Sequence, residues 1–245
     1  MKSMKVMIYG EGPTDYGWKN KSGKWEEGPA VRLVRKCAFV HDVDLDIEFG
    51  DKAVIDGKKR IKLGTRHLRG VRGKGIPALH FALYAMRNKC DKGIFYCDTD
   101  RVIEGKNTKE DDCRKHFLKI YDEVIFGFQA ADVKDWKGIP MIALKMIECW
   151  LLSDEDAYKE CFGQPPFQCR LPRKPELIWG EKSDKESNYP KNYMERVLKQ
   201  YYKESGKECF LEIADAMQVD VLRNKCPISF GKFFEDFEKM CILSK

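Results

Sequence analysis

Two short acidic motifs each follow an apolar run of the chain. Residues 4–9 run into Gly10-Glu11-Gly12, and residues 93–97 run into Asp98-Thr99-Asp100. If the two runs are neighbouring strands of a parallel sheet, we expect Glu11, Asp98 and Asp100 to meet at its carboxyl edge. Three carboxylates that close repel one another, and a bound divalent cation relieves the repulsion. The pattern therefore predicts metal-assisted phosphoryl chemistry.

A basic segment lies between the two motifs. From residue 51 to residue 75 the chain has nine lysines and arginines against two aspartates, whereas the net charge of all 245 residues is +6. We interpret this local excess as a surface for a polyanion, because phosphate contacts supply most non-specific affinity for nucleic acid. The alternative is an ordinary solvated loop. The candidate phosphate contacts are Lys58, Lys59, Arg60, Arg69, Arg72 and Lys74.

Lys74 is a candidate for a second role. It stands between two glycines, next to the helix that leads to the second acidic motif. A lysine there is suited to bind a phosphate or to stabilise charge in a transition state, and we count it among the candidate catalytic residues. The surrounding residues lack the rest of a Walker phosphate loop.

The elements that must position these motifs alternate between strands and helices. The hydrophobic pattern predicts helices over 29–38, 76–89 and 108–121, and an exposed polar excursion over 15–28. Strands are predicted over 4–9, 43–49, 93–97, 124–128 and 139–144. This order predicts an α/β fold with a mostly parallel sheet flanked by helices.

The composition changes near residue 161. Prolines punctuate residues 165–175, residues 180–190 are very polar, and helices are predicted over 191–203 and 230–240. We expect one domain over residues 1–160 and a mainly helical C-terminal extension, residues 161–245, packed on it. The phenylalanine stripe of the last helix favours core packing over base stacking.

The acidic motifs resemble those of the Toprim domain, the α/β metal-binding module of topoisomerases, bacterial primases, small ribonucleases and OLD-type nucleases. Glu11 matches the glutamate motif of that family, and Asp98 with Asp100 matches its DxD motif. Residues 148–154 (Glu-Cys-Trp-Leu-Leu-Ser-Asp) and 226–230 (Cys-Pro-Ile-Ser-Phe) resemble signatures of a narrower group of bacterial Toprim-like proteins, often associated with phage-defence loci. With these segments included, the resemblance spans most of the chain.

The resemblance implies that the three acids of the two motifs hold Mg²⁺ or Mn²⁺, hard ions that prefer oxygen ligands. One of these acids could serve instead as a general acid or base. Glu148 is an acid within an apolar run, so it is either paired or a further metal ligand. Asp154 is either a turn residue or a site member, and Asp15 is either a helix cap or a site member.

The function that the resemblance implies is metal-dependent cleavage of nucleic-acid phosphodiester bonds, in a phage-defence role. Its partners would be RNA or DNA and a protein such as the ATPase of a defence system. The alternative is a Toprim-like module that binds nucleic acid or a protein without cutting. A nucleotidyl transferase ranks lower, because the chain shows no zinc-binding or helicase part, and a topoisomerase ranks lower still.

Several other classes have no support in the sequence. The ten cysteines form no CxxC pair, so we expect reduced, mostly buried thiols. The four histidines lack paired metal spacing, and there is no GxSxG, HExxH or Rossmann glycine motif. No apolar run approaches the ~20 residues of a membrane span. We therefore expect a cytoplasmic protein with no membrane partner.

Overall fold

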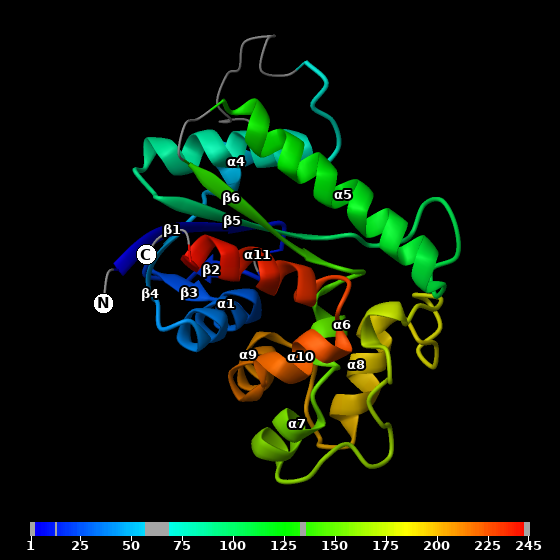
Figure 1. Ribbon diagram of the computed structural model, residues 1–245. Helices are drawn as coiled ribbons and strands as arrows, with labels where there is room; N and C mark the ends of the chain where they lie inside the picture. The colour runs from blue at the N-terminus through cyan, green and yellow to red at the C-terminus, as the bar shows by residue number, and fades with distance from the viewer. Residues whose placement is uncertain (1–2, 13, 57–68, 133–135, 243–245) are drawn as a thin grey trace.

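The computed structural model describes residues 3–12, 14–56, 69–132 and 136–242. Its centre is a four-stranded sheet with the strand order β4-β1-β5-β6 (Figure 1). All three strand pairings are parallel, which confirms the predicted α/β fold with a parallel sheet. The strands are β1 (Ser3–Gly10), β4 (Asp44–Phe49), β5 (Lys92–Asp98) and β6 (Lys137–Ala143).

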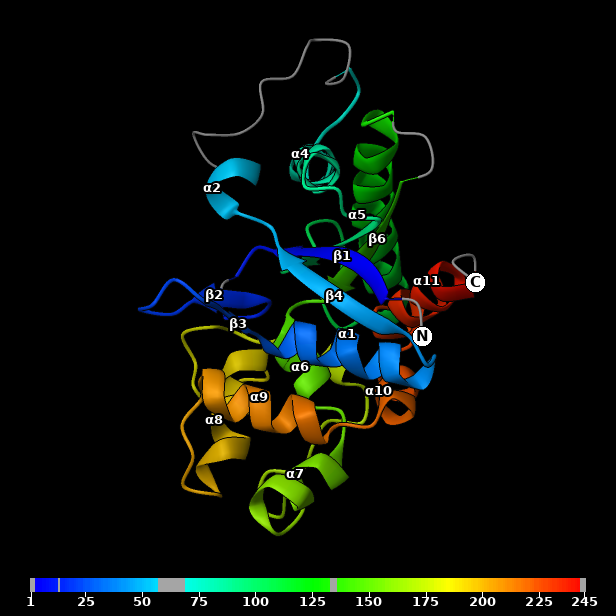
Figure 2. The ribbon, with the colours of Figure 1, turned by 90° about the vertical axis from the view of Figure 1, so that its left-hand side faces the viewer.

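Helices cover both faces of this sheet. One face carries α4 (Gly75–Arg87) and α5 (Glu110–Ala130), and the opposite face carries α1 (Pro29–Val40) and helices of the C-terminal region (Figure 2). The buried side chains accordingly form two hydrophobic clusters, one on each face. Because successive side chains of a strand point to opposite faces, each central strand contributes to both clusters.

The C-terminal region is helical, as predicted, but it has more helices than the two that the sequence suggested. The predicted pair corresponds to α8 (Pro190–Lys199) and α11 (Phe230–Ile242). The additional elements after residue 162 are α9 (Lys207–Ala216), α10 (Val219–Lys225) and the 3-10 turn Pro175–Leu177, and two further helices precede them, α6 (Ile147–Leu151) and α7 (Glu155–Phe162). The helices α6 to α11 share one hydrophobic cluster with α1 and the sheet, whereas Leu177 of the 3-10 turn packs against the other cluster. A domain division at residue 160 stays a prediction.

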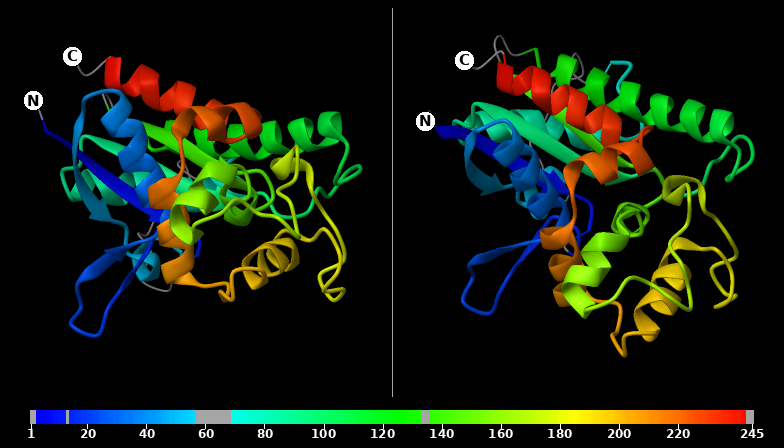
Figure 3. Two further views of the ribbon diagram at one scale, coloured as in Figure 1. Left: turned by 90° about the horizontal axis from the view of Figure 1, so that it is seen from below. Right: turned by 60° about the horizontal axis from the view of Figure 1, so that its bottom comes forward.

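The phenylalanines of α11 are buried in that cluster, so the expectation of core packing is confirmed. The same helix also lies beside α5 (Figure 3). Between the two helices, the Tyr121 hydroxyl donates a hydrogen bond to Asp236 at 2.6 Å. The helix at the end of the described chain is thus fastened to a helix that packs on the sheet.

The strand predicted over 124–128 is wrong, because these residues continue α5. Val124 and Phe128 are four residues apart and lie buried on one face of that helix. A short apolar run fits either a strand or a buried helix segment, and here the helical alternative holds. Gly127 permits the close packing of α5 on α4, since a Cβ there would lie 2.2 Å from the carbonyl oxygen of Gly75.

The polar residues 15–28 form an excursion with an exposed tip, as predicted, and it contains a hairpin that the sequence did not indicate. The hairpin consists of β2 (Gly17–Lys19) and β3 (Trp25–Glu27), and it projects from the body of the molecule (Figure 3). The Trp25 ring stacks on Phe49 with ring centroids 4.8 Å apart, which anchors the hairpin to the end of β4.

The two later signature segments meet in the core. Trp150 Nε1 donates to Ser229 Oγ at 2.8 Å, and the Trp150 ring makes an edge contact with Phe230. Ser229 Oγ in turn donates to the buried Glu176 at 2.7 Å. A buried polar network whose groups are paired holds its elements rigidly. This network fixes α6, the helix that carries Glu148, against the start of α11.

The remaining expectations concern thiols and membranes. All ten cysteines are free, and eight of them are buried, as predicted. Among the described residues, no helix is both long enough and apolar enough to cross a membrane.

Candidate functional site

The acidic motifs lie at the carboxyl edge of the sheet, on its two central strands. Gly10 of β1 pairs with Tyr96 of β5, so Glu11 and Asp98 follow on adjacent strands. Glu11 is one position and Asp98 two positions beyond this pair, and successive side chains of a strand point to opposite faces. The side chains of Glu11 and Asp98 therefore lie on opposite faces of the sheet. Tyr9 packs in the cluster under α4, and Glu11, two residues later, contacts Lys74 on that side. Tyr96 packs against Trp150 in the opposite cluster, and its hydroxyl donates to Asp98.

The predicted set of Glu11, Asp98 and Asp100 is therefore not drawn together into one group. Over the described ranges, no three His, Cys, Asp or Glu side chains are grouped so that they could hold a metal ion. The edge instead carries acids on both faces, each accompanied by a lysine, Lys74 on one face and Lys191 on the other.

On the α4 face, Glu11 is held by two lysines. The Lys74 ammonium forms an ion pair with Glu11 Oε1, with the two side chains 27% and 34% exposed. Lys52, in the short helix α2 (Lys52–Ile55), donates to the carbonyl oxygen of Glu11. The backbone N–H of Lys74 donates to Glu123 of α5 at 3.0 Å, which fixes the turn that carries this lysine. Both described ends of the basic segment thus converge on Glu11.

On the opposite face, Asp98 lies near two other acids, Asp15 from the turn after β1 and Glu148 from α6. Burial raises the pKa of Asp98 well above its usual range, and the charges of Asp15 and Glu148 raise it further. Burial also raises the pKa of Asp15 to about 6 and that of Glu148 to about 7. The carboxyl group of Asp98 is in no ion pair with a described residue. These three carboxyl groups, here called the acidic pocket (Asp15, Asp98 and Glu148), are therefore hard to ionise together, and a bound cation would favour their charged forms.

Within the acidic pocket Asp98 is half-buried, whereas Glu148 is only 6% exposed. One lysine of the C-terminal region faces the pocket. Lys191, in the first turn of α8, has its Nζ 4.0 Å from Glu148 Oε1, and the charge of Glu148 raises the pKa of Lys191. The sequence did not reveal this residue, because nothing around it marks a contact with α6.

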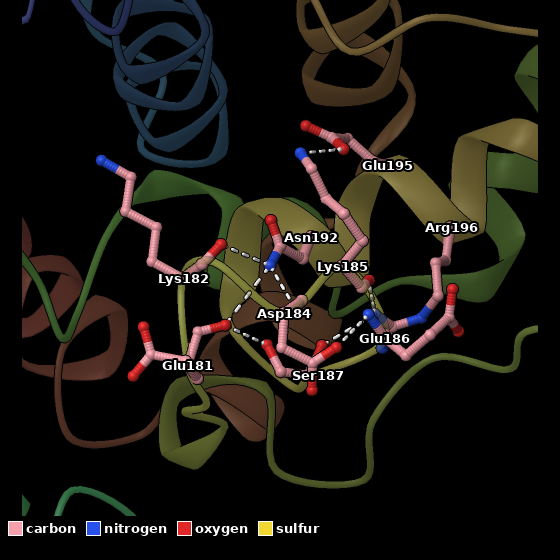
Figure 4. A network of polar contacts seen from close by, with 9 residues as sticks. All are labelled: Glu181, Lys182, Asp184, Lys185, Glu186, Ser187, Asn192, Glu195 and Arg196. Carbon is pink, nitrogen blue, oxygen red and sulfur yellow. Dashed lines mark hydrogen bonds and ion pairs between the residues drawn. The ribbon is translucent and has the colours of Figure 1, made fainter.

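The polar residues before α8 form a loop that is joined by hydrogen bonds to the helix that carries Lys191; Figure 4 shows the residues of this loop. The Asn192 side chain, 3% exposed, donates to three backbone carbonyls of the loop, and Arg196 donates to two more. The accepting carbonyls belong to Glu181, Lys182, Asp184, Lys185 and Ser187. The sequence suggests only a very polar loop here, and the structure shows that hydrogen bonds hold this loop to the helix that follows it.

The Asp98-Thr99-Asp100 turn is fastened to the end of β6 through Lys145. The Lys145 N–H donates to Thr99 Oγ1, and the Asp100 N–H donates to the Lys145 carbonyl, both at 2.9 Å. Asp100 has φ 52°, a left-handed conformation that aspartate tolerates better than most residues. The Lys145 ammonium is fully buried and donates to Asn107 at 3.2 Å, which ties the loop after Asp100 to the same point. This positioning lysine was also not predicted.

The structure describes the surroundings of two further acids. Asp154 caps α7, accepting hydrogen bonds from the N–H groups of Asp156 and Gln218 at 3.0 and 2.8 Å, so it has a structural role, at a helix start rather than in a simple turn. The helix cap expected at Asp15 is wrong, because β2 follows this residue, and the charge of Asp15 acts on Asp98. Membership of Asp15 in a functional site stays a prediction.

The predicted phosphate contacts are described only in part. Arg69 and Arg72 are exposed, as a nucleic-acid contact requires, and Lys74 is half-buried against Glu11. Lys58, Lys59 and Arg60 lie outside the described residues.

No family model matches the chain, and no curated protein and no solved structure matches it either. The Toprim resemblance therefore stays an interpretation of the motifs.

Proposed function

We propose that this chain is a divalent-metal-dependent hydrolase that cleaves phosphodiester bonds of nucleic acid. The observation that carries the proposal is the acidic pocket at the carboxyl edge of a parallel sheet, where Asp98, Asp15 and Glu148 all have raised pKa values. The charges of Asp15 and Glu148 disfavour ionisation of Asp98, and a divalent cation would offset that repulsion. Lys191, 4.0 Å from Glu148, supplies one positive charge there.

The donor chemistry of the pocket fits Mg²⁺ or Mn²⁺, because these ions prefer carboxylate oxygens and leave room for water and a substrate phosphate. Asp98, Asp15 and Glu148 would hold the ion, and the three carboxylates would have to come closer together to do so, because the described residues form no ready group of three metal ligands. When bound, it would supply Lewis-acid polarisation of a phosphate and a more acidic water. The exposed Arg69 and Arg72 would bind the nucleic-acid backbone.

One observation favours the alternative of a binding module that does not cut. Glu11, the acid that the Toprim motifs place first, is paired with Lys74, and the described residues do not form a finished three-ligand group. A role in phage defence and an ATPase partner rest on the family resemblance alone.

A cleavage assay separates the two functions. The purified chain is incubated with labelled RNA and with labelled DNA, each in Mg²⁺, in Mn²⁺ and in EDTA. We expect cleavage of at least one polymer in Mn²⁺ or Mg²⁺ and none in EDTA. Retention of the polymer on the protein without cleavage under every condition would show the binding module instead.

A further inference from the structure

The Lys74–Glu11 ion pair occupies the acid that should be most available to a cation. Glu11 follows a central strand between two glycines, and its side chain is 34% exposed. Yet its carboxylate is bound to an ammonium from the same chain, and a second ammonium, that of Lys52, sits on its carbonyl oxygen. A divalent cation that approaches Glu11 therefore meets two positive charges before it meets a free carboxylate.

The turn that carries Lys74 is built to aim this lysine at Glu11. Gly73 has φ 52°, a left-handed conformation that favours glycine, and a Cβ there would lie 2.0 Å from Glu123 Oε2, so a larger residue would displace the Glu123 side chain. The same glutamate accepts the backbone N–H of Lys74 at 3.0 Å. The backbone of the turn is fixed, whereas the lysine side chain has four flexible carbons and can redirect its ammonium without moving the turn.

The ion pair is weak enough to be opened by a phosphate. Partly exposed lysine–glutamate pairs contribute little net stability, because water solvates both groups well when they separate. A lysine is also a good phosphate ligand, and its hydrogen bonds to phosphate oxygens are charge-assisted. Lys74 belongs to the basic segment, close in sequence to the exposed Arg72, where a nucleic-acid backbone would bind.

We propose that Lys74 is a latch. Its ammonium group pairs with Glu11 until a nucleic-acid phosphate binds that ammonium group instead, and the freed carboxylate of Glu11 then contributes to cation binding. This inference rests on the proposed function and concerns the regulation of the same edge of the sheet, where the negative charge of Glu11 also acts on Asp15 of the acidic pocket. Linkage requires that the effect is reciprocal, so a cation on Glu11 would also favour nucleic acid on Lys74. A chain of this kind would complete its cation site only when substrate is bound.

The test measures Mn²⁺ affinity by calorimetry for the wild-type chain and for Glu11→Gln, each with and without a short phosphorothioate DNA that resists hydrolysis. The DNA itself also binds Mn²⁺, but it does so equally with both proteins. Its contribution therefore cancels when the Mn²⁺ affinity of Glu11→Gln is divided by that of the wild type. We expect Glu11→Gln to weaken Mn²⁺ binding by at least about ten-fold with DNA and by less than about two-fold without it.

Lys74→Met provides the second arm of the test. In this background Glu11 is free, so Glu11→Gln should weaken Mn²⁺ binding by about ten-fold even without DNA. Lys185→Met is the matched control, because it breaks the Lys185–Glu195 ion pair, at 3.0 Å, on the surface of α8. It should leave the Mn²⁺ affinity and the effect of Glu11→Gln unchanged.

Equal effects of Glu11→Gln with and without DNA would overturn the latch, as would no effect under either condition. If Mn²⁺ still binds and cleavage still needs Asp98, the proposed function stands while the latch falls. If no variant binds Mn²⁺ at all, both fall.

Discussion

Asp98→Asn is expected to lower metal-dependent cleavage of nucleic acid by about 1,000-fold or more, which corresponds to roughly 4 kcal/mol of transition-state stabilisation. Asparagine keeps the shape of the side chain and still accepts the hydrogen bond that the Tyr96 hydroxyl donates. It removes the negative charge that a cation needs at the centre of the acidic pocket. The initial rates of both proteins are measured with the same labelled substrate in saturating Mn²⁺.

Asp111→Asn is the matched control for this loss. Asp111 is an exposed aspartate in the first turn of α5 and is not one of the three acids of the acidic pocket, so the cleavage rate of Asp111→Asn should equal that of the wild type. Circular dichroism of all three proteins shows whether the fold is kept. An Asp98→Asn protein that retains its fold and cleaves within a few-fold of the wild type would remove Asp98 from the mechanism.

Glu148→Gln is expected to stabilise the protein at pH 8 while it weakens metal binding. The pKa of Glu148 is raised from 4.5 to about 7 in the folded chain, chiefly by burial. The folded state therefore binds this proton more tightly than the unfolded state does. That stabilising contribution is fully present below pH 4.5 and is lost as the pH rises through about 7. Glutamine mimics the protonated acid at every pH, so it avoids the loss.

The expected gain for Glu148→Gln is about 2–3 kcal/mol in the free energy of unfolding at pH 8, and close to zero at pH 4.5. Urea unfolding at the two pH values, in EDTA, measures both. Glu195→Gln is the control, because Glu195 is an exposed acid paired with Lys185, and it should show no gain. If Glu148→Gln were no more stable than the wild type at pH 8, the ammonium group of Lys191 would already offset the cost of ionising Glu148. The acidic pocket would then lack the electrostatic cost that we infer.

A gain in the stability of the protein on replacing the Glu148 carboxylate would itself indicate a functional site. Buried like charges cost stability, and chains keep them where activity requires them. In this fold the cost is concentrated at one sheet edge, while the buried Glu176 in the core is fully paired with Ser229 and the backbone N–H of Ile228.

The sheet was predictable because its strands carry strong local signals. Apolar runs such as residues 4–9 and 93–97 can satisfy their side chains only in a buried strand or helix, and their length and flanking glycines favour the strand. The segment 124–128 is a similarly apolar run, but it is helical because it continues α5. The short helices α7, α9 and α10 were missed, although Asp154 and the spacing of Phe210 and Ile213 carry ordinary helix signals.

The site was predictable only in its location. The sequence placed Glu11 and Asp98 at one edge of the sheet, and the structure does so too. Their separation to opposite faces depends on the register that sets Gly10 against Tyr96, and no local pattern encodes that register. Lys191 comes from a helix far along the chain and meets Glu148 only through the tertiary packing of α6 and α8.

A crystal of the wild-type chain soaked in Mn²⁺ tests the central claim most directly. Anomalous density should lie about 2.1 Å from a carboxylate oxygen of Asp98 and in ligating contact with Asp15, Glu148 or both. Density only elsewhere, with the three carboxylates of the acidic pocket still apart and Lys191 still against Glu148, would contradict the account.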